Sequence, residues 1–194
     1  MTRHSHTNHC GFTLLELLMV VGVGVLVTAV AVPNVVVAVS NSRLRASMTS
    51  LSGIMQSTRM LAVNQNRAMT THITVQPQGI VAYAKLATNS TPVYVNDMQV
   101  EMEAPIIKVT TPSGVGAPPA LSSAVLGFTP QTGDPSFNTR GMPCAYSAGT
   151  CINHGFAYYF HDNRPASTTG WSAVSISPAG RIKKWFWNGS AWID

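Results

Sequence analysis

An apolar run near the start of the chain constrains its fold more than any other feature. From Phe12 to Val39 the one ionisable side chain is that of Glu16. This stretch of 28 residues is longer than the roughly 20 that a helix needs to cross a bilayer. Only 10% of the chain is charged, compared with about 25% in a typical soluble domain. We therefore expect a single membrane-spanning helix over residues 12–39, followed by one polar head domain.

The segment before the apolar run, residues 1–11, is short and polar. An ordinary secretory signal has its small-residue cleavage site after the apolar core, and no such site follows this run convincingly. Cleavage is therefore expected before the run, which leaves the apolar segment on the mature protein. One interpretation of His4, His6 and His9 in this segment is a metal site. Metal ligands need a scaffold that fixes their geometry, so we favour discarded leader residues and predict no metal.

Residues 11–18 (GFTLLELL) resemble the processing site of type IV prepilins and type II secretion pseudopilins. In that family a prepilin peptidase cuts after the glycine and methylates the new N-terminal phenylalanine. The resemblance implies cleavage between Gly11 and Phe12 and an N-methylated Phe12. It also implies a single-pass protein of the bacterial inner membrane with its head in the periplasm. The leader departs from the family pattern, since Arg3 is its one Lys or Arg.

Glu16 is the unusual residue of the apolar run, because a carboxylate inside a membrane is costly and marks a function by default. The resemblance implies that Glu16 neutralises the terminal amine of a neighbouring subunit during filament assembly, since buried opposite charges are tolerated when paired. The alternatives are a Glu16 near the lipid headgroups, or one that stabilises the positive end of its own helix. Pro33 should kink or locally melt this helix, and a proline at this distance recurs in pilins.

The pattern of apolar residues changes twice after Val39. Residues 40–69 follow a helical period, so they are expected to continue the helix as an amphipathic half that packs on the head domain. Residues 70–194 follow a period of two, which predicts a β-rich head. A helix followed by strands predicts an α+β fold, and the resemblance implies the pilin fold, a long hydrophobic helix packed on an antiparallel sheet. The predicted strands are 72–75, 80–83, 93–95, 106–109, 125–128, 155–160 and 173–176.

Two further strings, residues 137–143 (FNTRGMP) and 176–181 (ISPAGR), resemble the GspH/FimT branch of this family. That branch comprises minor pseudopilins of type II secretion and minor pilins of type IV pili. The resemblance implies a subunit at or near the filament tip that initiates assembly, with prepilin peptidase and other pilins or pseudopilins as partners. We expect neither a cofactor nor an enzyme, because His154 and the pair His161–Asp162 lack the spacing of a catalytic site.

The chain has three cysteines, Cys10, Cys144 and Cys151. Cleavage after Gly11 removes Cys10 and leaves an even number, which suits an oxidising compartment. A disulfide between Cys144 and Cys151 is therefore expected. Two thiolates with His154 as a metal site are the alternative, but no second ligand pair accompanies them.

The C-terminal residues combine cations with tryptophans. The dipeptide Asn188-Gly189 is typical of a two-residue hairpin turn, which would place Trp185 opposite Trp192. Strand alternation then predicts one face that carries Arg181, Lys183, Trp185, Trp187 and Trp192.

Two interpretations of this C-terminal face remain open. Cations beside flat rings grip a phosphate backbone and stack bases, and the formal charge of +5 is compatible with a nucleic-acid partner without showing one. FimT-type pilins of DNA uptake carry a Gly-Arg-x-Arg element. Residues 180–183 read GRIK, so Lys183 replaces the second arginine, and Lys184 adds a further cation. The favoured interpretation is that the tryptophans are the packed edge of the sheet and the cations its solvated rim.

Overall fold

The computed structural model describes residues 13–76, 79–87, 99–103, 106–114, 116–162 and 170–194. The expected leader of residues 1–11, the cleavage and methylation positions Gly11 and Phe12, and the expected strand at 93–95 lie outside these residues. The chain divides into two compact units, Met1–Val39 and Ser40–Asp194.

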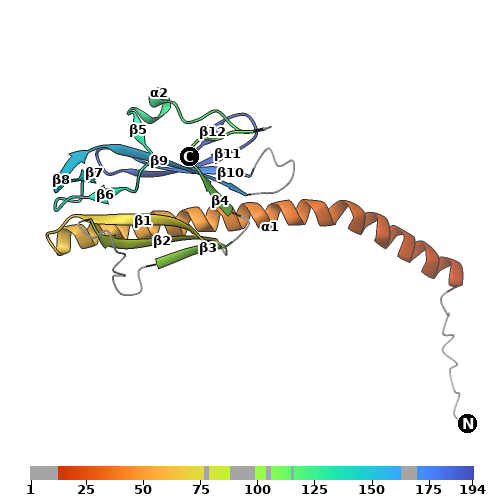
Figure 1. The fold of residues 1–194 in the computed structure, drawn as a ribbon. Coiled ribbons are helices and arrows are strands. Elements are labelled where there is room, and N and C mark those ends of the chain that lie inside the picture. The colour runs from red at the N-terminus through yellow and green to blue at the C-terminus, as the bar shows by residue number, and fades with distance from the viewer. Residues whose placement is uncertain (1–12, 77–78, 88–98, 104–105, 115, 163–169) are drawn as a thin grey trace, which may run out of the picture. The chain divides into compact units, whose positions relative to one another are not determined.

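The first element is a helix, α1, Leu14–Asn64 (Figure 1). Its residues 14–39 are exposed, and within the described residues α1 is the one helix long and apolar enough to cross a membrane. Pro33 lies inside α1 without interrupting it. The side-chain amide of Asn34 donates to the Val30 carbonyl at 3.1 Å, close to the backbone bond that the proline removes. Local melting at Pro33, one of the two expected effects, is not observed.

The later part of α1 carries the apolar stripe that the sequence predicted. Its side chains are buried, with exposed fractions between 0% and 2%. The stripe comprises Leu44, Met48, Leu51, Met55 and Ala62. These residues share one core cluster with residues from strands of both sheets described below, so this half of the helix organises the head domain.

The end of α1 is set by a left-handed residue. Asn66 has φ of +50°, and its N–H donates to the Val63 carbonyl, while the N–H of Arg67 donates to the Ala62 carbonyl at 3.1 Å. This pair of bonds is a Schellman motif, in which asparagine takes the position that glycine usually holds. The helix therefore ends at Asn64, five residues before the expected position 69.

Within the described residues, twelve strands follow α1 in two six-stranded sheets (Figure 1). The first sheet has the order β3-β2-β1-β6-β7-β8, and the second has β12-β11-β10-β9-β4, with β5 pairing parallel to β9. Every other pair is antiparallel. The strands are β1 Met69–Gln76, β2 Gly79–Leu86, β3 Gln99–Glu103, β4 Ile106–Val109, β5 Pro130–Gln131, β6 Ser136–Phe137, β7 Pro143–Ser147, β8 Thr150–Asn153, β9 Gly155–Asp162, β10 Trp171–Ile176, β11 Ile182–Trp187 and β12 Trp192–Ile193. The expected α+β fold, with a long N-terminal helix packed on antiparallel strands, is confirmed.

One predicted strand is wrong. Residues 123–126 form a short helix, α2 (Ser123–Leu126), because Ser122 caps its start and Gly127, with φ of +77°, caps its end. The following residue, Phe128, packs on Gly155, where a β-carbon would lie 2.2 Å from the ring. Phe128 therefore packs against the start of β9, and residues 125–128 do not form a strand.

Candidate functional site

The start of α1 places Glu16 in a capped first turn. The Oγ1 atom of Thr13 accepts from the backbone N–H of Glu16 at 3.2 Å, and the Thr13 carbonyl accepts from the N–H of Leu17 at 3.1 Å. The sequence Thr-x-x-Glu at a helix start is the pattern of a capping box. Glu16 is exposed, and its neighbours along residues 14–39 are almost all apolar. The geometry therefore accommodates both a helix-stabilising role and a role in pairing with a second charge.

The C-terminal hairpin has a different register from the one predicted. Trp187 lies opposite Trp192 and Phe186 opposite Ile193, so the loop has four residues, 188–191. The cause is the side chain of Asn188, whose Oδ1 accepts from the backbone N–H groups of Ser190 and Ala191 at 2.9 and 2.8 Å. An asparagine that satisfies these donors closes a wider loop than the two-residue turn that Asn-Gly suggests.

Trp185 belongs to the head's second, smaller core. It is 7% exposed, it clusters with Ala157, Tyr159 and Ala173, and its Nε1 donates to Ser175 Oγ at 2.8 Å. A ring held in this way offers little surface to a base. Trp185 is therefore placed where the favoured packing interpretation expects it.

The other tryptophans of the hairpin are half-buried at the rim of this core. The rings of Trp187 and Trp192 meet edge to face, with centroids 5.6 Å apart. Trp192 also approaches Tyr159 and donates from Nε1 to the Pro119 carbonyl at 2.8 Å. These contacts attach the hairpin to the segment that precedes α2.

The three C-terminal cations have different surroundings. The Nζ of Lys183 pairs with the Asp194 carboxylate and lies 4.8 Å from the centroid of the Trp185 ring. This hydrogen bond and charge lower the pKa of Asp194. Lys184 donates to Thr49 Oγ1 at 3.2 Å on α1, on the opposite face of β11. Arg181 is exposed and precedes the strand.

The two remaining cysteines of the expected mature chain are bonded to each other. Cys144 on β7 and Cys151 on β8 have their Cα atoms 5.3 Å apart and form the predicted disulfide. The hairpin between them turns at Ala148 and Gly149, whose φ values of +49° and +82° are those of a two-residue hairpin turn. Sequence reasoning missed these two strands because an Ala-Gly turn lacks the usual Asn-Gly or Asp-Gly signature.

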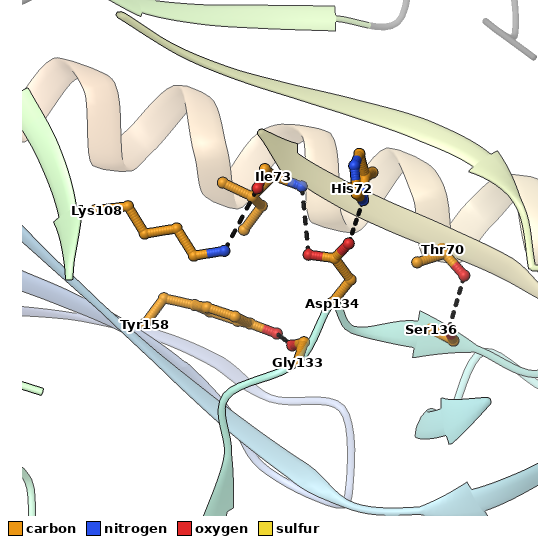
Figure 2. A network of polar contacts seen from close by, with 8 residues as sticks. All are labelled: Thr70, His72, Ile73, Lys108, Gly133, Asp134, Ser136 and Tyr158. Carbon is orange, nitrogen blue, oxygen red and sulfur yellow. Dashed lines mark hydrogen bonds and ion pairs between the residues drawn. The ribbon is translucent and has the colours of Figure 1, made fainter. Parts of the chain in front are cut away.

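A polar network that the sequence did not predict lies at the edge of β1 (Figure 2). His72 donates from Nδ1 to the Asp134 carboxylate, and the other oxygen of Asp134 accepts from the N–H of Ile73 at 3.4 Å. Lys108, on β4, donates from Nζ to the Ile73 carbonyl at 3.4 Å. Tyr158 donates to the Gly133 carbonyl, and its burial, assisted by the Asp134 charge, raises its pKa so that the phenol keeps its proton.

The two strings that resemble the GspH/FimT branch meet at one side chain of α1, that of Arg59. Its Nη1 donates to the Gly180 carbonyl at 3.1 Å. A β-carbon at Gly141 would lie 3.0 Å from Arg59 Nε, and one at Gly180 would lie 3.2 Å from Arg59 Cζ. Both glycines have positive φ, +73° and +83°, so their turns also favour glycine. A turn from each of the two sheets therefore packs against the same residue of α1, Arg59.

The comparisons with known proteins give a structural likeness. No family model matches the chain, and no curated protein is significantly similar to it in sequence. Among solved structures it is similar to the type IV minor pilin FimU of Pseudomonas aeruginosa strain PAO1, with a TM-score of 0.45 and 17% identity. The match covers 79% of this chain and 95% of that chain. A likeness this loose carries no inference about function, so the proposals below rest on the residues of this chain.

Proposed function

We propose that this chain is a pilin-like filament subunit, stored in the bacterial inner membrane and assembled into a type IV pilus or a type II secretion pseudopilus. The observation that carries the proposal is the first half of α1, which is bilayer-length, exposed and apolar apart from the carboxylate of Glu16 in its first turn. The GFTLLELL string at the same place supplies the processing site that such a subunit needs. In this proposal the segments are a leader of residues 1–11, a membrane and filament-core segment of residues 12–39, an amphipathic segment of residues 40–69, and a periplasmic head of residues 70–194.

Processing is the first test of the proposal. Co-expression of the full chain with a prepilin peptidase should yield a mature protein that begins at N-methylated Phe12, as intact-mass and N-terminal peptide spectra would show. The Gly11→Leu variant should retain the leader. Gly22→Leu is the matched control, since position 22 lies in α1 with open space around its β-carbon, and it should be processed normally. Cleavage at another position, or equal cleavage of both variants, would overturn the proposal.

Assembly through Glu16 is the second test, and it separates the two roles that the geometry accommodates. Glutamine keeps the capping pattern of the first turn but has no charge. If Glu16 pairs with the terminal amine of a neighbouring subunit, Glu16→Gln and Glu16→Ala should both be processed and membrane-inserted yet poorly incorporated into sheared filaments. Normal incorporation of Glu16→Gln, with loss only in Glu16→Ala, would assign Glu16 to helix capping instead.

The finer role is that of a minor subunit of the GspH/FimT type, at or near the filament tip, that initiates assembly. This finer assignment rests on the two strings that resemble the branch, residues 137–143 and 176–181, which both contact Arg59. Deletion of the gene should reduce the number of filaments without shortening those that form. Fewer surface pili would indicate the pilus, and retained enzymes in the periplasm would indicate the secretion system.

DNA capture by the C-terminal hairpin is the second proposed function, favoured by the exposed cation Arg181 at the start of β11 and by the half-buried rings of Trp187 and Trp192 at the other end of that strand. Binding of single- and double-stranded DNA by the full chain in detergent should fall steeply with salt. It should also weaken in the Arg181→Ala/Lys183→Ala variant and persist in a control that removes Arg67 and Arg140. Salt-insensitive or absent binding would leave the hairpin with a packing role alone.

A further inference from the structure

The edge of β1 is completed by side chains instead of a strand. The strand β6 pairs with β1 only at Met69 and Thr70, and the next contact is the Thr71 N–H to the Pro135 carbonyl at 2.9 Å. Beyond this point the N–H and carbonyl of Ile73 are bonded by Asp134 and Lys108. The backbone therefore turns away from β1 and leaves space beside its last residues.

A pocket of about 280 Å³ occupies this space, between the end of β1, the end of β4 and the part of β9 that lies between its pairings with β4 and β5. Its apolar lining includes Ile73, Val75 and Val109. Its polar lining includes Lys108, Thr110 and Thr132. Val75 is 61% exposed, so its side chain offers apolar surface to a ligand in this pocket. The volume suits a ligand of only a few heavy atoms.

Lys108 brings a positive charge to this pocket. Among the described residues no carboxylate lies within ion-pair distance of its Nζ, whose contacts are the Ile73 carbonyl and the face of the Tyr158 ring, 5.5 Å from the centroid. The carboxylate of Asp134 is already engaged by His72 and the Ile73 N–H. Burial lowers the pKa of Lys108, and attraction to Asp134 only partly opposes this. Burial therefore destabilises the charged ammonium more than the attraction to Asp134 stabilises it.

We propose that this pocket binds a carboxylate on a short apolar stem, with the Lys108 ammonium as its counter-ion. A carboxylate accepts charge-assisted hydrogen bonds from the ammonium, and the threonine hydroxyls beside it are further donors. The apolar lining takes the stem. A phosphate would have too many oxygens to satisfy at a single cation, and a cation would be repelled. The site is independent of filament assembly and would be a ligand-binding site of the head domain.

The carboxylate has two sources, a free short-chain acid and the C-terminus of an extended peptide. The probes are butyrate, its neutral isostere butyramide, and the peptide Ala-Ala-Val with a free or an amidated C-terminus. The full chain in detergent, with its lysines ¹³C-dimethylated, gives an NMR signal for each of its lysines, Lys85, Lys108, Lys183 and Lys184. The signals of the other three lysines serve as internal controls for non-specific effects.

We expect a saturable shift of the Lys108 signal alone, with butyrate or with the free-acid peptide, and a rise in the pKa of Lys108 when the site is filled. Lys108→Met should bind at least about tenfold more weakly by calorimetry, while Lys85→Met should bind as the wild type does. Response to butyrate identifies a small acid as ligand, and response to the peptide alone identifies a chain terminus. Equal responses to butyrate and butyramide, a uniform shift of all lysines, or no shift would overturn the proposal.

Discussion

Replacement of Gly141 by alanine tests how tightly the turns of the head close on α1. Position 141 has φ of +73°, and a left-handed alanine costs about 1–2 kcal/mol. The new β-carbon would also lie 3.0 and 3.1 Å from Arg59 Nε and Cγ, and 3.1 Å from Val63 Cγ2. Arg59 can retreat only by disturbing its bond to the Gly180 carbonyl, so this contact should add about 1–3 kcal/mol, as overpacking does. The total loss in the free energy of unfolding is expected to be about 2–5 kcal/mol.

Gly149→Ala is the matched control for the backbone term. Its φ of +82° is close to that of Gly141, but nothing lies within 4 Å of a β-carbon there. The difference between the two variants therefore isolates the contact with α1. All four tryptophans of the chain lie after position 170, so intrinsic fluorescence during denaturant titration of the full chain reports on the head.

A double-mutant cycle with Arg59→Ala identifies the side chain responsible. Arg59→Ala alone should destabilise the head through lost packing and the lost bond to Gly180. Combined with Gly141→Ala, it should cost less than the sum of the single losses by about 1 kcal/mol or more, because the crowded partner is gone. Equal losses in Gly141→Ala and Gly149→Ala, or strict additivity with Arg59→Ala, would refute the proposed closure on Arg59.

Three further outcomes are expected from the structure. Cys144→Ser, or reduction of the Cys144–Cys151 disulfide, should lower the free energy of unfolding by about 2.5 kcal/mol, the loop-closure value for so short a ring; an unchanged denaturation midpoint under reductant would contradict this. Because the pKa of Lys108 is lowered in the folded state, the unfolded chain binds its proton more tightly, so the contribution of Lys108 to stability should rise as pH increases from the folded pKa towards 10.5. The raised pKa of Tyr158 acts in the opposite direction above pH 10.0, so the test is the difference in stability between the wild type and Lys108→Met, and a difference that does not change with pH across that range would disprove the assignment. Trp185→Phe leaves the hydroxyl of buried Ser175 without its partner and should cost about 1–3 kcal/mol, whereas a loss below 0.5 kcal/mol, the usual limit for a surface change, would show that Trp185 is not core.

The parts of the fold that the sequence predicted are those with a local periodic signal. The stripe from Leu44 to Ala62 repeats with the period of a helix, and its burial follows directly from that period. Residues 155–160 and 173–176 were predicted as strands and lie within β9 and β10, which are buried along their length. The short strands β5 and β6 have only two residues each, too few for alternation to be visible. The predicted register of the C-terminal hairpin was wrong because it depends on the length of the loop. That length is set by the hydrogen bonds of a single side chain, that of Asn188.

The candidate sites also divide into those with a local signal in the sequence and those without one. The disulfide joins residues seven apart and was predictable, and the first turn of α1 is local in sequence. His72 and Asp134 are 62 residues apart, and no pattern in the sequence connects them with Lys108. Arg59 shows that the need for a glycine can depend on a residue far away in the sequence, because its partner Gly180 lies 121 positions away. Each turn alone would need only a residue that tolerates positive φ, a role that Asn66 fills elsewhere in this chain. The helix side chain removes that freedom, so glycine at positions 141 and 180 is required by α1 as much as by the turns themselves.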